Sequence, residues 1–188
     1  DGAGGEGGAG GSANICPEGQ VCLDVERTGE AEGRFAVIWF RFDGPNLADP
    51  TIAYQAPLAN TDSEIAFELA ALSPAPDVVR FCTRDCEVPA DCPCTGDFQA
   101  AVAYLMVVGD ENMDGSVDAS EVKEGNLFGI ANTALVQSPA SFPVVPAEFA
   151  GSFPQGVEEG TFAYRITEGG AFVPTEATRF TLKAGAPL

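Results

Sequence analysis

Residues 35–42 read FAVIWFRF, a run that is apolar at every position except Arg41. A strand of this kind is apolar on both faces, so it is expected at the centre of a β structure that covers both of its sides. Upstream, Val21, Leu23 and Val25 alternate with other residues, which is typical of a strand with one face on a core. The two patterns together predict a layered all-β protein.

Similar short runs recur along the rest of the chain between turn-forming residues. They fall at 51–57, 63–72, 77–83, 98–108, 128–136, 162–167 and 179–183. With the first two runs they predict a disulfide-bonded β-sandwich, immunoglobulin-like or similar, of about nine strands within a domain spanning residues 15–188. Residues 138–160 are rich in Pro and Gly, which predicts a long surface loop. Its aromatic residues Phe142, Phe149 and Phe153 either anchor this loop to the core or form a ligand-binding lip.

The chain is strongly acidic, with 9 Lys and Arg against 28 Asp and Glu, and it contains no histidine. A surface with a formal charge of −19 repels phosphate backbones and anionic lipids, so nucleic acid is not an expected partner. Without histidine, the usual general base of hydrolases is missing. A glycosidase that uses two carboxylates stays as an alternative, although nothing in the sequence selects a pair. No apolar run reaches the ~20 residues of a membrane span.

The first 14 residues, DGAGGEGGAGGSAN, form a low-complexity tract with almost no side chains to bury. The tract is predicted to be a flexible tether. It resembles the spacer that follows the lipid-modified cysteine of secreted bacterial lipoproteins, which implies a lipid anchor upstream of residue 1. Alternatively, the tract adds as a strand to the sheet edge of another copy, which would give a homo-oligomer or filament.

The six cysteines are Cys16, Cys22, Cys82, Cys86, Cys92 and Cys94. Their even number and their turn-like surroundings predict three disulfides and an oxidising compartment. Cys22 is expected on the polar side of its strand, which favours a local bridge to Cys16. The other four cysteines would form the remaining two bridges. A zinc site at these four is the alternative, but their spacing suits zinc less well.

The most specific motif is DENMDGSVDASE at residues 110–121, which matches the calcium-loop pattern D-x-[DN]-x-[DN]-G-x5-E at every specified position. Calcium prefers six to eight oxygen ligands on a tightly curved path. Gly115 would permit the sharp turn at positive φ, and Val117 is expected to point into the core. The predicted ligands are the side chains of Asp110, Asn112, Asp114, Asp118 and Glu121 and the backbone carbonyl of Ser116. The alternative is an acidic, solvated loop that binds nothing.

This loop resembles the calcium loops of EF-hand proteins and of the related dockerin modules, over these twelve residues alone. The resemblance implies one bound Ca²⁺ ion. The flanks depart from the family, because residues 98–109 read FQAAVAYLMVVG and predict a buried strand where an entering helix would stand. Residues 119–124 allow a turn or two of helix before Gly125 and Asn126 end it. A sensor that opens a groove needs a pair of helices, so it is not expected.

These features predict a secreted or cell-surface structural or interaction module, stabilised by calcium and disulfides, and not an enzyme. The first alternative is a carbohydrate- or protein-binding accessory module, which would have an aromatic-lined cleft. The second is the glycosidase, which would have two facing carboxylates in a pocket. The numbered sequence does not begin with an apolar signal peptide. The prediction of a secreted protein therefore requires the numbered chain to be the mature product.

Overall fold

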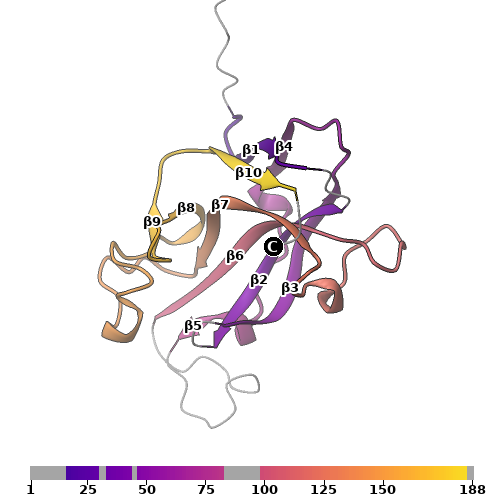
Figure 1. Ribbon diagram of the computed structural model, residues 1–188. Helices are drawn as coiled ribbons and strands as arrows, with labels where there is room; N and C mark the ends of the chain where they lie inside the picture. The colour runs from indigo at the N-terminus through magenta and orange to yellow at the C-terminus, as the bar shows by residue number, and fades with distance from the viewer. Residues whose placement is uncertain (1–15, 30–32, 44–45, 83–97, 186–188) are drawn as a thin grey trace, which may run out of the picture.

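The computed structural model describes residues 16–29, 33–43, 46–82 and 98–185 (Figure 1). The fold is all-β, as predicted, with nine strands of three or more residues and the two-residue β5. The helical segments in the described ranges are single 3-10 turns at Leu69–Ala71, Asp77–Val79, Ala119–Glu121 and Ala147–Phe149. The strands are β1 (Gln20–Arg27), β2 (Arg34–Asp43), β3 (Asn46–Pro57), β4 (Glu64–Glu68), β5 (Phe81–Cys82), β6 (Gln99–Val108), β7 (Leu127–Ser138), β8 (Gly160–Ile166), β9 (Phe172–Pro174) and β10 (Arg179–Ala184).

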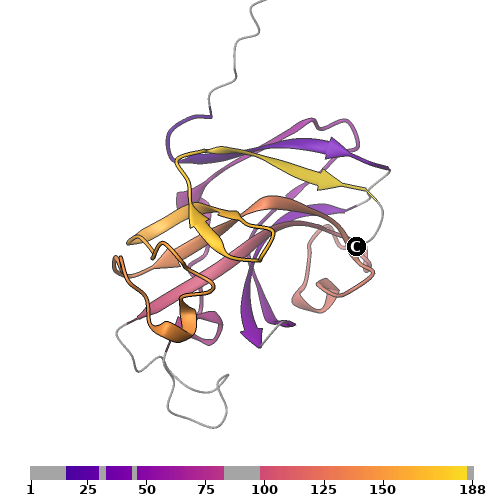
Figure 2. The same cartoon turned by 60° about the vertical axis from the view of Figure 1, so that its left-hand side comes forward.

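The ten strands join into one curled sheet (Figure 2). Seven of them follow the order β3-β2-β6-β7-β10-β1-β4, while β5 pairs with β6, β8 with β7, and β9 with β8. Strand β7 forks this sheet, because the same edge pairs with β10 over Gly129–Ala131 and with β8 over Thr133–Ser138. Strands β1 and β10 pair in parallel, and the other pairings are antiparallel. The expected sandwich of two separate sheets is therefore not confirmed, since the fork keeps both layers in one hydrogen-bonded sheet.

Strand β2 is covered on both faces, as its continuous apolar run predicts. Phe35, Val37 and Trp39 point into the main core, which they share with β6 and with the layer made by β1, β4 and β10. Ala36 and Ile38 point to the other face, where they pack against residues of β6 and the segment after it. The buried Trp39 side chain donates a hydrogen bond from Nε1 to the Ser73 carbonyl at 2.9 Å, which satisfies its polar atom.

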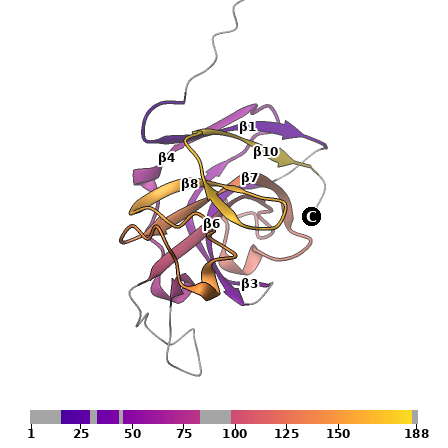
Figure 3. The same ribbon diagram turned by 90° about the vertical axis from the view of Figure 1, so that its left-hand side faces the viewer.

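A second core lies between the far ends of β6 and β7 and residues 139–158. Phe153 is buried there, and Phe142 and Phe149 are partly buried and stack around Phe98. The three aromatic residues thus anchor the predicted surface loop, as one of the two interpretations expected. In Figure 3 this loop and β8 lie on the same side of the molecule.

Two predicted strands are shorter than their sequence patterns suggest. The run at 63–72 gives β4 and then a 3-10 turn, and the run at 77–83 gives a 3-10 turn and the two-residue β5. Ser73 and Pro74 follow the first run. Here the chain leaves the ladder, and the Ser73 carbonyl accepts the hydrogen bond from Trp39. The ladder of β4 already ends at Glu68, because its partner Gln20 is the first residue of β1.

The predicted local disulfide between Cys16 and Cys22 is present, with the two Cα atoms 5.8 Å apart. Cys22 lies on the face of β1 that also carries Asp24, opposite the core residues Val21 and Leu23, as expected, and its side chain is nevertheless buried in the bridge to Cys16. The remaining predicted bridges fall largely outside the described residues, which leave out Cys86, Cys92 and Cys94. Across the described ranges, no helix is long and apolar enough to cross a membrane.

Candidate metal centre

The predicted calcium loop connects two neighbouring antiparallel strands, β6 and β7. The last pair of this ladder is Val108 with Leu127, and the Gly109 N–H then donates to the Asn126 carbonyl at 3.0 Å. The loop is therefore an insertion at the end of a β-hairpin, as the departure of its flanks from the helical family pattern predicts. The expected short helix after it is one 3-10 turn, Ala119–Glu121.

The first half of the loop folds back on its own side chains. Asp110 accepts hydrogen bonds from the Asp114 and Gly115 N–H groups at 3.2 and 2.8 Å. Asn112 Oδ1 accepts from the Asp114 N–H at 2.9 Å, and Asp114 Oδ1 accepts from the Ser116 N–H and hydroxyl at 2.8 and 2.6 Å. Gly115 has a φ of 84°, the left-handed turn that glycine adopts at low cost. Three predicted ligands thus line one tight turn.

Glu121 closes the second half of the loop and is only 4% exposed. Its Oε1 accepts hydrogen bonds from the Glu111 and Asn112 N–H groups at 2.8 and 3.2 Å, and its Oε2 accepts from the Asp118 N–H at 2.8 Å. The Asp118 side chain in turn accepts from the Glu121 backbone, which makes a capping box on the 3-10 turn. The carboxylate of Glu121 therefore bridges the beginning and the end of the twelve-residue loop.

Backbone and hydroxyl donors favour the ionised form of two predicted ligands. Hydrogen bonds from the hydroxyl and N–H of Ser116 hold the pKa of Asp114 below its ordinary value. The Asp118 N–H has the largest part in lowering the pKa of Glu121, and desolvation opposes it. Both carboxyl groups are therefore anionic at neutral pH, which is the form that binds a cation.

Contacts outside the loop fix its base to the sheet. Val117 is buried, as predicted, and packs with Ile38 and Met106 on the outer face of β2 and β6. Its N–H donates to Gln55 Oε1 on β3 at 2.7 Å, and the Arg34 Nε donates to the same oxygen at 3.2 Å. Loop and sheet therefore share one hydrogen-bond network.

Asn126 holds the neck of the loop together. Its Nδ2 donates to the Gly109 carbonyl at 2.9 Å and to the Glu121 carbonyl at 2.7 Å. A Cβ atom on Gly109 would lie 2.1 Å from Asn126 Oδ1, so any larger residue at this position would displace the Asn126 side chain. The sequence motif does not include Gly109 or Asn126 among its specified positions, which is why reasoning from the motif assigned them no role in the site.

The fit of this loop to a calcium ion rests on the chemistry of its donors. The predicted ligands supply carboxylate, amide and backbone carbonyl oxygens, the hard ligands that Ca²⁺ prefers. Within the described ranges, no group of three acidic, cysteine or histidine side chains is arranged so that it could hold a metal ion. The physical reason lies in Glu121, whose oxygens face backbone N–H groups of the loop. A bound ion would require Glu121 to exchange part of these bonds for metal coordination.

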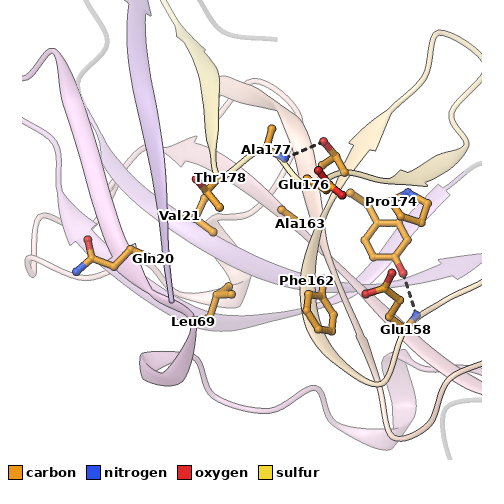
Figure 4. Close-up of a pocket in the computed structure, with 12 residues that line it drawn as sticks. Gln20, Val21, Leu69, Glu158, Phe162, Ala163, Pro174, Glu176, Ala177 and Thr178 are labelled. Carbon is orange, nitrogen blue, oxygen red and sulfur yellow. Dashed lines mark hydrogen bonds between the residues drawn. The ribbon is translucent and has the colours of Figure 1, made fainter. Parts of the chain in front are cut away.

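A second concave site, which the sequence did not predict, lies between β1 and the β8–β9 hairpin (Figure 4). It is a groove of about 500 Å³ with Val21 and Leu69 on one side and Phe162 and Ala163 on the other. Phe162 is 42% exposed and lies with Val21, Leu69 and Pro174 in the lining of the groove. The groove joins residues about 140 positions apart in the chain, so no local pattern could have found it.

Comparison of the chain with models of protein families, with curated proteins and with solved structures finds no match.

Proposed function

We propose that this chain is a secreted or cell-surface structural or interaction module whose β6–β7 loop binds one calcium ion. The predicted ligands are Asp110, Asn112, Asp114, Ser116, Asp118 and Glu121. In this role the ion would neutralise part of an acidic loop and fasten it to the outer face of β2 and β6. The module would act by binding and by its rigid shape, not by catalysis.

The observation that carries this proposal is the turn at Asp110–Ser116. Asp110, Asn112 and Asp114 accept hydrogen bonds from N–H groups of the same turn, which orders these three side chains. A loop already ordered in this way loses less conformational entropy on binding an ion. The oxidising location is supported by the Cys16–Cys22 disulfide.

Assembly through residues 1–14 stays part of the proposal, and these residues lie outside the described ranges. The tract would pair with an exposed strand edge of another copy, because a glycine-rich segment gains stability mainly from backbone hydrogen bonds. Deleting it should therefore reduce self-association and leave the melting temperature of the monomer nearly unchanged. Sedimentation velocity on the full and shortened chains measures the first effect, and equal association of both would reject this role.

A binding-module function is the second candidate, and the groove with the exposed Phe162 favours it. The same groove contains two acidic side chains, Glu158 and Glu176. Both are exposed to solvent, whereas a general acid of a glycosidase is kept protonated by a buried, apolar environment. The groove therefore supports binding more than hydrolysis.

The test of the calcium proposal compares melting temperatures in calcium and in chelator. Calcium at a hundred times its Kd should raise the free energy of unfolding by about 2.7 kcal/mol. For a chain of this length the melting temperature should rise by about 5–10 °C. Glu121→Gln should lose most of this rise, and Glu124→Gln, an exposed neighbour outside the motif, should keep it. Equal melting of the natural chain in both buffers would reject the proposal.

A further inference from the structure

The groove between β1 and β8 has one strand edge without a neighbour in the described sheet. Strand β9 pairs with β8 only over Tyr164–Ile166, so the same edge of Thr161–Ala163 continues without it. Strand β10 pairs with β1 from Cys22 onward, but the Gln20 N–H before that pairing already donates to the Pro17 carbonyl at 3.1 Å. The open edge of β8 borders the groove, whose lining side chains are drawn in Figure 4. An unpaired edge offers backbone donors and acceptors to an added strand.

The fork in β7 accounts for this opening. Strands β8 and β10 pair with successive parts of the same edge of β7. Asn132 lies between the two pairings, and its Oδ1 accepts a hydrogen bond from the Thr181 N–H at 3.1 Å. The side-chain bond replaces a ladder bond where the two strands separate. The separation is therefore built into the sheet and does not depend on the loops above it.

The floor of the groove is apolar, and its charged rim is acidic. Val21, Leu69, Phe162 and Pro174 contribute the apolar surface. The charged residues among those that line the groove are Glu158 and Glu176, and the described lining contains no Lys or Arg. A partner that lies here meets an apolar surface with two negative charges on the side of the β8–β9 hairpin, so opposite charge on the partner is favoured.

We propose that this groove binds an extended peptide segment of another protein that carries an apolar side chain flanked by lysine or arginine. The segment lies along the free edge of β8, where its backbone pairs with Thr161–Ala163. Its apolar side chain contacts Phe162, and its basic residues face Glu158 and Glu176. An extended segment suits an open strand edge because alternate side chains then point into and out of the groove. The acidic N-terminal tract of this chain is a poor occupant, since Asp1 and Glu6 would add like charges.

The experiment uses the isotope-labelled full chain and three probe peptides. These are acetylated and amidated KVTFTVK, its charge-reversed partner EVTFTVE, and a peptide of residues 1–15. The basic peptide should give saturable amide shifts at 20–21, 161–164 and 175–178, with a Kd at or below about 1 mM. Phe162→Ser should weaken its binding at least about fivefold, because the largest apolar contact is lost. Glu176→Lys should weaken it about three- to tenfold.

Two matched variants control for general effects on the surface. Val144→Ser removes an apolar side chain that is 84% exposed away from the groove, and Glu168→Lys reverses an exposed charge beyond its lining. Both should bind the basic peptide like the natural chain. No shifts up to about 5 mM peptide, equal binding of the acidic peptide, or tighter binding of the 1–15 peptide would each overturn the proposal.

This inference rests on the proposed function only in taking the module to act by binding. The calcium loop lies on the outer face of β2 and β6, away from the groove (Figure 1). Calcium titration of Phe162→Ser should therefore give the natural affinity. If the natural chain binds calcium but not the basic peptide, the peptide site alone is rejected. If it binds the peptide but not calcium, the calcium site alone is rejected.

Discussion

Asn126→Ala should loosen the neck of the predicted calcium loop, residues 110–121, and lower the stability of the whole chain. The side chain of Asn126 is 5% exposed and donates two hydrogen bonds, to the carbonyls of Gly109 and Glu121 at 2.9 and 2.7 Å. Alanine removes the donor and leaves both acceptors without this partner. A buried polar group left unsatisfied costs about 1–3 kcal/mol. Because water can reach part of the loop, we expect a total loss of about 2–4 kcal/mol.

Urea unfolding in the presence of chelator measures this loss without any contribution from calcium. Asn132→Ala is the matched control, because Asn132 is exposed and accepts one hydrogen bond, from the Thr181 N–H at 3.1 Å. Its loss should stay within about 0.5–1.5 kcal/mol. If Asn126→Ala loses under about 1 kcal/mol, or no more than the control, the two carbonyls do not depend on this side chain and the reasoning is refuted.

Three further predictions concern the core, the disulfide and alkaline pH. Val117→Ala should reduce the free energy of unfolding by about 2 kcal/mol, because two buried methyl groups are lost under the loop, and an unchanged urea midpoint would argue against that packing. The double variant Cys16→Ser/Cys22→Ala opens a bridge with a sequence separation of 6 and should lose about 2 kcal/mol by the same measurement; full retention of stability would contradict the prediction. Burial raises the pKa of Tyr104 and Tyr164 above 10.0, so the folded chain holds more protons than the unfolded chain above that pH. Stability should therefore be complete below about pH 10 and fall as pH rises through the folded-state pKa, and a flat profile between about pH 9 and pH 11.5 would count against burial of these hydroxyls.

Local patterns were sufficient to predict most strands, and they failed where long-range pairing decides the structure. The run at 35–42 predicted β2 because a strand covered on both faces needs apolar residues at every position. The three-residue β9 was missed, since so short a strand is stabilised only by β8 and has no periodicity of its own. The parallel pairing of β1 with β10 joins the two ends of the described chain, and no local signal specifies it.

The candidate metal site divides in the same way. Asp110 to Glu121 follow a pattern of fixed spacing, because each ligand position corresponds to one point on a curved backbone, and this pattern is readable in the sequence. The contacts that hold the loop in place cannot be predicted from such a pattern. Gln55 reaches Val117 from a strand 62 positions away, and the role of Asn126 depends on the hairpin that brings it beside Gly109.

Calorimetric titration of the natural chain with calcium, after treatment with chelator, measures directly whether residues 110–121 bind the ion. We expect one binding event per chain, with an affinity in the range of about 10⁻⁴–10⁻³ M typical of extracellular modules. Glu121→Gln should weaken this binding, and Glu124→Gln should leave it unchanged. A titration of the natural chain without binding heat, together with a melting temperature that calcium does not alter, would contradict the account and leave residues 110–121 as a solvated acidic loop.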